Sequence, residues 1–315
     1  MKPTVLIAAK FPPRLLGRLG EHYTLIGPLE RPEPRAIPAE AHEVRALITL
    51  GGIRTDAALM DALPRLGLIA CFGTGYEGVD LAAARARGIA VTHAGDTNST
   101  AVAEFAMGLV IASARKIVRG DRLVRAGRWR GDLIERVNET PELAGRRLGI
   151  YGLGSIGSRV ARRAAAFEME IGYHNRSPRP DVPYLYHPTL LGLATWADIL
   201  VVSVRADASN HHAVDREVLA ALGPKGHLIN VSRGIAVDTV ALCDALEAGT
   251  IAGAGIDVYE DEPHIPERLT RLDNVVLTPH MAAISANAQR AQRDIMHANL
   301  EAFFAGRPVL TPVPE

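Results

Sequence analysis

The stretch LGIYGLGSIG, residues 148–157, decides the fold of this chain. It is an apolar, strand-like run that enters a Gly-x-Gly-x-x-Gly turn, and the turn opens a helical segment at 155–167. Gly152 permits the tight turn, Gly154 lets the backbone approach a pyrophosphate, and Gly157 lets the helix pack closely on the strand. A second strand-like run follows at 170–175, so we expect a dinucleotide-binding βαβ unit. The residues expected to contact the cofactor in this turn are Gly152, Leu153, Gly154, Ser155, Ile156 and Gly157.

The residues at the end of the second strand indicate which dinucleotide binds. Residues 171–177 read IGYHNRS, with Asn175, Arg176 and Ser177 where such folds usually place an acidic residue. A carboxylate there would accept hydrogen bonds from the ribose hydroxyls of NAD and would repel a 2′-phosphate. Because that repulsion is missing and an arginine can pair with a phosphate, the segment favours NADP(H), with NAD(H) possible. The alternative is that Arg176 simply points into solvent.

Length and composition limit the classes of protein that fit. The chain has 315 residues, 48% of them hydrophobic, which is enough for two domain cores. The 35 basic and 35 acidic residues cancel, so we expect no nucleic-acid partner, and no apolar run is long enough to span a membrane. The N-terminus is typical of a first strand rather than a secretory signal, and two distant cysteines suit a reducing compartment. We therefore expect a cytoplasmic protein.

Short β-branched runs alternate with helical segments along most of the chain, which is typical of parallel sheets covered by helices. The alternation is interrupted by a long apolar helix at 97–117 and an Arg-rich, weakly patterned segment at 118–146, and the chain closes with a helix at 285–305. We predict an α/β fold of two doubly wound parallel-sheet domains. They are a flavodoxin-like, substrate-binding domain of residues 1–98 plus 285–315, and an inserted Rossmann domain of residues 99–284 for the dinucleotide.

Three polar residues stand just after strands of the second series: Arg233 in NVSRG, Glu262 in EDEP and His280 in TPH. Ligands of open parallel sheets bind beyond the carboxyl ends of the strands, so all three are expected near the cofactor. A carboxylate can orient an imidazole and favour its protonated, donating form, and an arginine can hold a substrate carboxylate. With a nicotinamide, these groups suit hydride transfer to a 2-keto acid. Taken singly, each is more often solvated or structural.

Other chemistries find little support in the sequence. His211, His212 and Asp215 lie close together, but no further ligand follows at a sensible spacing, so we predict no metal site. No Gly-x-Ser-x-Gly or phosphate-loop motif is present, so hydrolysis and phosphoryl transfer are not indicated.

Four motifs in order, GLGSIG, NVSRG, GAGIDVYEDEP and NVVLTPH, resemble the D-isomer-specific 2-hydroxyacid dehydrogenases over nearly the whole chain. The resemblance implies that Arg233 and Glu262 are catalytic and that His280 donates the proton. The NRS segment and the stretch LGPKGHLINVSRG are similar to NADPH-dependent members that reduce glyoxylate, hydroxypyruvate or hydroxyphenylpyruvate. The resemblance also implies further cofactor contacts, with the last of them near the nicotinamide carboxamide: Val231, Ser232 and Asp257.

The same resemblance implies a substrate cleft between the domains, where backbone N–H groups of the smaller domain hold the substrate carboxylate. Members of the family are mostly dimers, and residues 98–146 match the region that joins their subunits. Trp129 and Arg130 would then reach a neighbouring subunit's site or simply pack. The segments TLGGIRT (49–55) and FGTGYEG (72–78) match the substrate loop and its neighbour, so the candidates for substrate contact are Leu50, Gly51, Gly52 and Gly75, with Arg233.

Two differences from other members of the wider family limit which cofactor and which substrate this chain is expected to use. NAD-using members carry Asp where this chain has Asn175, and formate dehydrogenases carry Gln where it has Glu262. We therefore predict NADPH-dependent reduction of a small 2-keto acid to the D-2-hydroxy acid. The alternatives are an NAD-dependent dehydrogenase of another D-2-hydroxy acid, and a non-catalytic protein that senses the dinucleotide, as some members of the family act as co-repressors.

Overall fold

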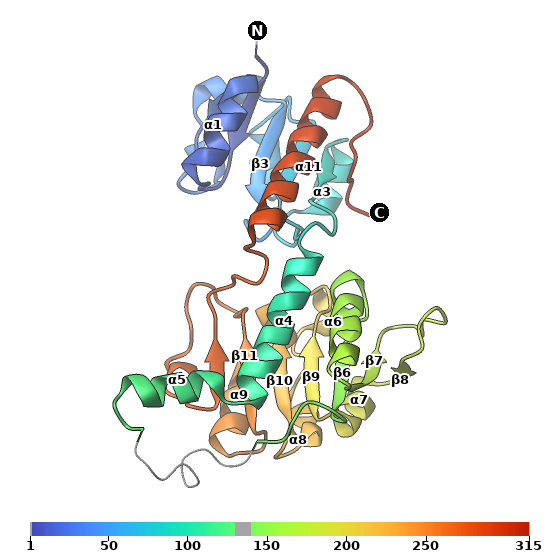
Figure 1. Ribbon diagram of the computed structural model, residues 1–315. Coiled ribbons are helices and arrows are strands. Elements are labelled where there is room, and N and C mark those ends of the chain that lie inside the picture. Colours follow the sequence, from blue (N-terminus) through green and yellow to red (C-terminus); the bar gives the residue numbers. More distant parts are fainter. Residues whose placement is uncertain (1, 130–139, 315) are drawn as a thin grey trace. The chain divides into compact units, whose positions relative to one another are not determined.

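The computed structural model describes residues 2–129 and 140–314. The chain divides into two compact units, Met1–Asn98 with Ser285–Glu315, and Ser99–Ile284. Each unit is built around one parallel β-sheet (Figure 1). The prediction of an α/β fold with two doubly wound parallel sheets is confirmed. Among the described residues, no helix is both long and apolar enough to cross a membrane.

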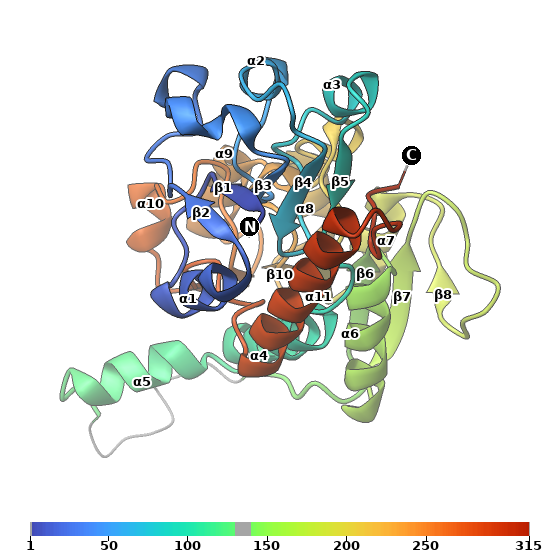
Figure 2. The ribbon, with the colours of Figure 1, turned by 90° about the horizontal axis from the view of Figure 1, so that it is seen from above.

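The first unit has a five-stranded sheet in the order β2-β1-β3-β4-β5, which is the flavodoxin-like order. Apolar side chains alternate between its two faces, so α1 and α11 cover one face and α2 and α3 the other (Figure 2). The strands are β1 (Thr4–Ile7), β2 (Thr24–Ile26), β3 (Ala46–Leu50), β4 (Leu68–Phe72) and β5 (Ala90–Thr92). The helices are α1 (Pro13–His22), α2 (Ala57–Asp61), α3 (Leu81–Ala86) and α11 (Ala286–Phe304), with 3₁₀ turns at Pro34–Ala36 and Ala39–Glu43.

The second unit has a seven-stranded sheet in the order β12-β11-β10-β9-β6-β7-β8, which continues the Rossmann order. Helices α4 and α6 pack on one face, and α7, α8 and α9 on the other. The strands are β6 (Arg147–Tyr151), β7 (Glu170–His174), β8 (Leu185–Tyr186), β9 (Ile199–Val202), β10 (His227–Asn230), β11 (Gly253–Ile256) and β12 (Val275–Leu277). The helices are α4 (Ser99–Ala114), α5 (Ile117–Arg125), α6 (Ser155–Ala166), α7 (Leu190–Trp196), α8 (Arg216–Leu222), α9 (Thr239–Glu247) and α10 (Glu267–Thr270), with 3₁₀ turns at Ala208–Asn210 and Gly234–Ala236.

Local sequence explains where many of these elements begin. The central strands β9 and β10 are buried along their whole length, as expected for strands covered by helices on both faces. Several helices start at a short polar side chain that accepts a hydrogen bond from a backbone N–H three residues later. These caps include Asp215 at α8, Asp238 at α9 and Ser285 at α11.

The structure departs from the expected elements in three places. The helical pattern of residues 55–66 forms a helix only over Ala57–Asp61, because Pro64 disfavours helical backbone at the residue before it. The edge strands β2 and β8 have three and two residues, too few to show a period in the sequence. The weakly patterned segment at 118–146 begins with the regular helix α5, and Arg130 lies outside the described residues.

Candidate active site

In the glycine-rich turn after β6, two glycines are closely packed against other atoms and one has free space at its Cβ position. Gly152 has φ of +99°, and a Cβ there would lie 2.8 Å from the backbone nitrogen of Val204. A Cβ on Gly157 would lie 2.2 Å from the carbonyl oxygen of Gly152. In contrast, a Cβ on Gly154, the N-cap of α6, would meet no atom within 4 Å. The first two glycines are therefore required by packing, whereas Gly154 faces open space, as the approach of a pyrophosphate requires.

Neighbouring side chains hold the turn by its backbone. Asn175 Oδ1 accepts a hydrogen bond of 2.7 Å from the Leu153 N–H, and the Ser203 hydroxyl donates one of 2.8 Å to the Gly152 carbonyl. Arg179 donates to the Leu153 carbonyl and to the Ser158 hydroxyl, both at 3.0 Å. Asn175 Oδ1 therefore supports the turn itself, and the contact expected between Asn175 and the cofactor stays a prediction.

Two arginines stand beside this turn, of which only one was expected. Arg176 and Ser177 are exposed after β7. The pKa of Asp207 is lowered, chiefly by its hydrogen bonds from Ser209 and further by the charge of Arg176. Arg179 is half-buried and is also paired with Asp181. Its position three residues after Arg176, in the same basic segment, is the sequence signal that could have identified it.

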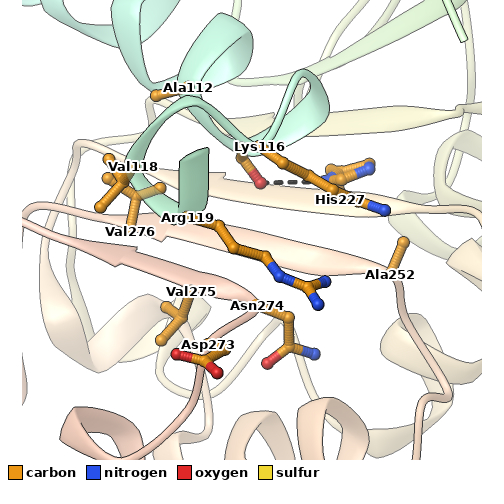
Figure 3. A pocket seen from close by; sticks show the side chains of 11 residues that line it. Ala112, Lys116, Val118, Arg119, His227, Ala252, Asp273, Asn274, Val275 and Val276 are labelled. Atoms are coloured by element: carbon orange, nitrogen blue, oxygen red, sulfur yellow. Dashed lines mark hydrogen bonds between the residues drawn. The ribbon is translucent and has the colours of Figure 1, made fainter. Parts of the chain in front are cut away.

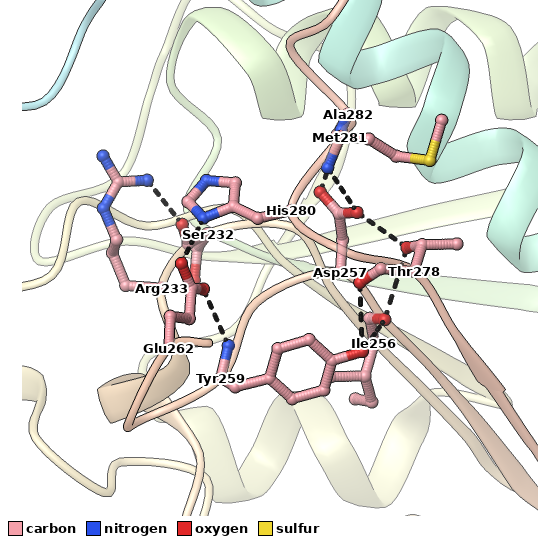
Figure 4. Close-up of polar contacts among 10 residues, drawn as sticks. All are labelled: Ser232, Arg233, Ile256, Asp257, Tyr259, Glu262, Thr278, His280, Met281 and Ala282. Atoms are coloured by element: carbon pink, nitrogen blue, oxygen red, sulfur yellow. Dashed lines mark hydrogen bonds and ion pairs between the residues drawn. The ribbon is translucent and has the colours of Figure 1, made fainter. Parts of the chain in front are cut away.

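Arg233, Glu262 and His280 gather beyond β10, β11 and β12 at the carboxyl edge of the same sheet (Figure 4). His280 Nδ1 and Glu262 Oε2 are 2.7 Å apart, and the Tyr259 N–H donates to Glu262 Oε1 at 3.0 Å. Burial alone would raise the pKa of Glu262, but these hydrogen bonds and the charge of Arg233 lower it below its ordinary value. Glu262 is therefore an ionised carboxylate that fixes the imidazole of His280 through Nδ1 and leaves Nε2 for another partner.

The segment before Arg233 is fixed by its own strand end. Val231 and Ser232 are buried, and Asn230 Oδ1 accepts hydrogen bonds from the Ser232 N–H and hydroxyl at 3.1 and 2.9 Å. Asn230 Nδ2 donates to the Arg233 carbonyl at 3.0 Å, and the Arg233 guanidinium donates to the Ser232 carbonyl at 2.7 Å. The cofactor contacts expected of Val231 and Ser232 stay predictions, and Asn230 is a supporting residue that the sequence did not single out.

Asp257 has a role that the sequence did not reveal. It is fully buried, and its carboxylate accepts hydrogen bonds from the Thr278 hydroxyl at 2.6 Å and from the N–H groups of Met281 and Ala282, both at 2.9 Å. The His280 N–H donates to the Asp257 carbonyl at 2.9 Å. Asp257 therefore holds the loop that presents His280. Because its carboxylate is covered, the expected contact with a nicotinamide carboxamide stays a prediction.

The candidates in the first unit lie where β3 and β4 end. A Cβ on Gly51 would lie 2.0 Å from the Gly75 carbonyl oxygen, so the loops that follow these strands touch through their backbones. The Gly51 carbonyl also accepts a hydrogen bond of 2.7 Å from the Gly78 N–H. Gly52 is exposed with no atom near its Cβ position, and Leu50 is partly exposed. Contact of these residues with a substrate stays a prediction.

A cavity in the second unit lies at the opposite, amino edge of the sheet (Figure 3). His227 starts β10 there, and its Nδ1 is 2.9 Å from the Ser113 hydroxyl of α4. Burial, together with the charges of Arg146 and Lys116, lowers the pKa of His227 to about 4. This histidine is a buried neutral residue of the core, and it is not part of the candidate site.

Three comparisons with known proteins show which family this chain resembles. The sequence model of the D-isomer-specific 2-hydroxyacid dehydrogenase NAD-binding domain matches residues 107–282. A hydroxyphenylpyruvate reductase of Plectranthus scutellarioides is 42% identical, over 87% of each chain, and a glyoxylate/hydroxypyruvate reductase of Arabidopsis thaliana is 39% identical, over 98% of each. The crystal structure of an NADPH-dependent glyoxylate/hydroxypyruvate reductase of Sinorhizobium meliloti with NADP and malonate is 43% identical, with a TM-score of 0.92 over 99% of this chain and 97% of that one.

Proposed function

Because the chain belongs to the D-isomer-specific 2-hydroxyacid dehydrogenase family, we propose that it reduces a small 2-keto acid to the D-2-hydroxy acid with NADPH. The observation that carries this proposal is the hydrogen-bonded Glu262–His280 pair, with Arg233 beside it, in the unit that holds the dinucleotide turn. Glyoxylate, hydroxypyruvate and aromatic 2-keto acids are the first substrates to test, because similar proteins are named for them.

The residues of the second unit fit a phosphorylated dinucleotide. The open face at Gly154 leaves room for a pyrophosphate at the N-terminus of α6, where the helix dipole favours anions. No carboxylate stands at residues 175–177, and Arg176 supplies positive charge after β7, whereas Arg179 is already paired with Asp181. This charge distribution supports NADPH over NADH as the preferred cofactor.

Different residues of the chain then have different roles in the reaction. Bound NADPH supplies the hydride that C2 of the keto acid receives. Arg233 holds the substrate carboxylate and polarises the adjacent carbonyl. His280, oriented through Nδ1 by Glu262, donates a proton from Nε2 to the forming alkoxide. The backbone N–H groups of residues 50–52 are proposed as further carboxylate ligands.

The proposal is tested by following NADPH absorbance with about ten 2-keto acids and the purified protein. We expect turnover with at least one of them and a higher kcat/KM with NADPH than with NADH. His280→Ala should lower kcat about a hundredfold or more, with NADPH binding intact. Equal efficiency with both cofactors would favour the NAD-dependent alternative, and tight NADPH binding with no turnover of any keto acid would favour the dinucleotide sensor.

We also propose that the protein is a homodimer in the cytoplasm. Helix α5 exposes Ile117 and Val124, and Trp129 follows it with 61% of its surface exposed. Exposed apolar groups on one short segment are typical of a surface that another chain covers. Light scattering after gel filtration should give twice the mass of 33.7 kDa, and a monomer would contradict the dimer.

A further inference from the structure

The second unit contains another glutamate–histidine pair, which the proposed mechanism does not use. Glu260 Oε2 lies 3.0 Å from His212 Nε2, and the two side chains are 30% and 35% exposed. Glu260 comes from the same loop as Glu262, and His212 has a left-handed φ of 51°, as His280 does at 48°. Such backbone is uncommon for a residue with a side chain and persists only where its surroundings hold it.

Glu260 connects segments that are far apart in the sequence. Its Oε1 accepts a hydrogen bond of 2.9 Å from the Thr239 N–H, at the first residue of α9. Its Oε2 bonds His212, and the His212 N–H donates to the Ile235 carbonyl at 2.7 Å. A carboxylate at a helix N-terminus is favoured by the unpaired N–H groups and the dipole, so this contact is a stable anchor.

The segment anchored in this way is the one that carries Arg233. The 3₁₀ turn Gly234–Ala236 begins directly after Arg233, and the Val214 N–H donates to the Ala236 carbonyl at 2.9 Å. A Cβ on Gly234 would lie 2.0 Å from the carbonyl carbon of Tyr259, so the Arg233 turn rests on the backbone next to Glu260. A change at Glu260 is therefore expected to reach Arg233 through His212 and the turn at Gly234–Ala236.

We propose that the Glu260–His212 pair is a clamp that positions Arg233 for the carboxylate of the 2-keto acid, an inference that rests on the proposed function. One short loop then positions both the proton donor and the group that binds the substrate carboxylate. Glu262 orients the proton donor His280, and Glu260, two residues earlier, sets the place of the carboxylate-binding Arg233. Neither Glu260 nor His212 touches the substrate in this proposal, so both are positioning residues.

The test compares Glu260→Ala with Glu260→Gln in steady-state kinetics. Glu260→Ala removes both anchors, and displacement of Arg233 should lower kcat/KM for the keto acid about tenfold to a hundredfold, chiefly through KM. The Kd for NADPH should stay within about twofold, because the clamp does not contact the glycine turn. Glu260→Gln should recover most of the loss, since its amide oxygen can accept from Thr239 and its NH₂ can donate to a neutral His212.

The matched control is Glu247→Ala, which removes a similarly exposed carboxylate from α9 that pairs only with Arg268 in the described contacts. It should leave kcat/KM unchanged. A Glu260→Ala variant with wild-type kcat/KM, or a Glu260→Gln variant as defective as Glu260→Ala, would overturn the clamp while leaving the proposed function standing.

Oxalate binding to the NADPH complex, measured by calorimetry, separates the two proposals. It reports the carboxylate site without turnover, and Glu260→Ala should weaken it about tenfold. A wild-type protein that neither reduces any 2-keto acid nor binds oxalate would overturn both the proposed function and the clamp. Oxalate affinity equal in the wild type and in Glu260→Ala would overturn the clamp alone.

Discussion

Replacing Gly154 with alanine should weaken dinucleotide binding while leaving the fold intact. A Cβ at this position meets no protein atom within 4 Å, and φ of −87° lies outside the left-handed region. Alanine is a poorer N-cap than glycine by about 1 kcal/mol, but it also lowers the entropy of the unfolded chain by about 0.4–1 kcal/mol. The two effects largely cancel, so the free energy of unfolding should change by less than about 1 kcal/mol.

The effect on the ligand should be much larger, because the new methyl group occupies the face that the pyrophosphate approaches. Losing one charge-assisted hydrogen bond from the helix N-terminus costs about 1.5–3 kcal/mol. Since about 1.4 kcal/mol corresponds to a factor of ten, the Kd for NADPH should rise about tenfold to a hundredfold.

Gly157→Ala should behave differently from Gly154→Ala, because Gly157 is closely packed. Its Cβ would lie 2.2 Å from the Gly152 carbonyl oxygen and 3.0 Å from both Ile150 Cγ2 and Ser203 Oγ, so backbone must move. Such overpacking costs about 1–3 kcal/mol, which lowers the melting temperature by about 2–12 °C. This variant should lose stability as well as NADPH affinity. Gly17→Ala in α1, which also has no atom near its Cβ position, is the neutral control for binding.

The two measurements are NADPH titration by calorimetry and thermal unfolding by circular dichroism. The expected pattern is weak binding with a normal melting temperature in Gly154→Ala, and both defects in Gly157→Ala. If Gly154→Ala binds NADPH as tightly as the wild type, the open face is not the pyrophosphate site and the reasoning is refuted.

Three further predictions concern the cofactor, the His280 loop and the core. Arg176→Ala should lower kcat/KM with NADPH about tenfold or more and leave NADH little changed; equal losses with both would exclude a role in selectivity. Asp257→Asn should lower both kcat and the melting temperature, because its NH₂ replaces one accepting oxygen and leaves a buried N–H donor unpaired at about 1–3 kcal/mol; normal values of both would contradict this. The pKa of His227 is about 4 in the folded chain, and its ordinary value is about 6.5. As the pH falls, His227 is therefore protonated in the unfolded chain before it is protonated in the folded chain. Stability should thus fall by about 3 kcal/mol as the pH drops from 7 to 4, and urea unfolding of His227→Gln should lack this part of the loss.

The sequence identified the parts of the site that depend on local pattern. Strand period, the glycine spacing and the polar residues at strand ends placed the turn at 152–157, and they predicted that Arg233, Glu262 and His280 would meet. These predictions succeed because the carboxyl ends of parallel strands share one edge, so local positions determine a tertiary neighbourhood. His280 and Glu262 form a hydrogen bond because both follow strands that end at this edge.

The supporting contacts could not be obtained in the same way. Asn175 bonds Leu153 across 22 residues of sequence, and Glu260 bonds His212 across 48. Such contacts depend on loop conformations that no periodicity encodes. The bond from the Leu153 N–H to Asn175 Oδ1 is a supporting contact that the sequence pattern does not show, and the expected contact of Asn175 with the cofactor stays a prediction.

The loop of His280 shows why the supporting residues matter as much as the catalytic ones. A left-handed residue with a side chain costs about 1–2 kcal/mol, and a buried carboxylate is costly unless every oxygen is paired. Asp257 offsets both costs with the same bonds, because the donors that satisfy its carboxylate, Thr278, Met281 and Ala282, are neighbours of His280. The imidazole is thus held from two sides, by Glu262 at the ring and by Asp257 at the backbone. It follows that substitutions at Asp257 should disturb catalysis even where they leave the Glu262–His280 pair chemically unchanged.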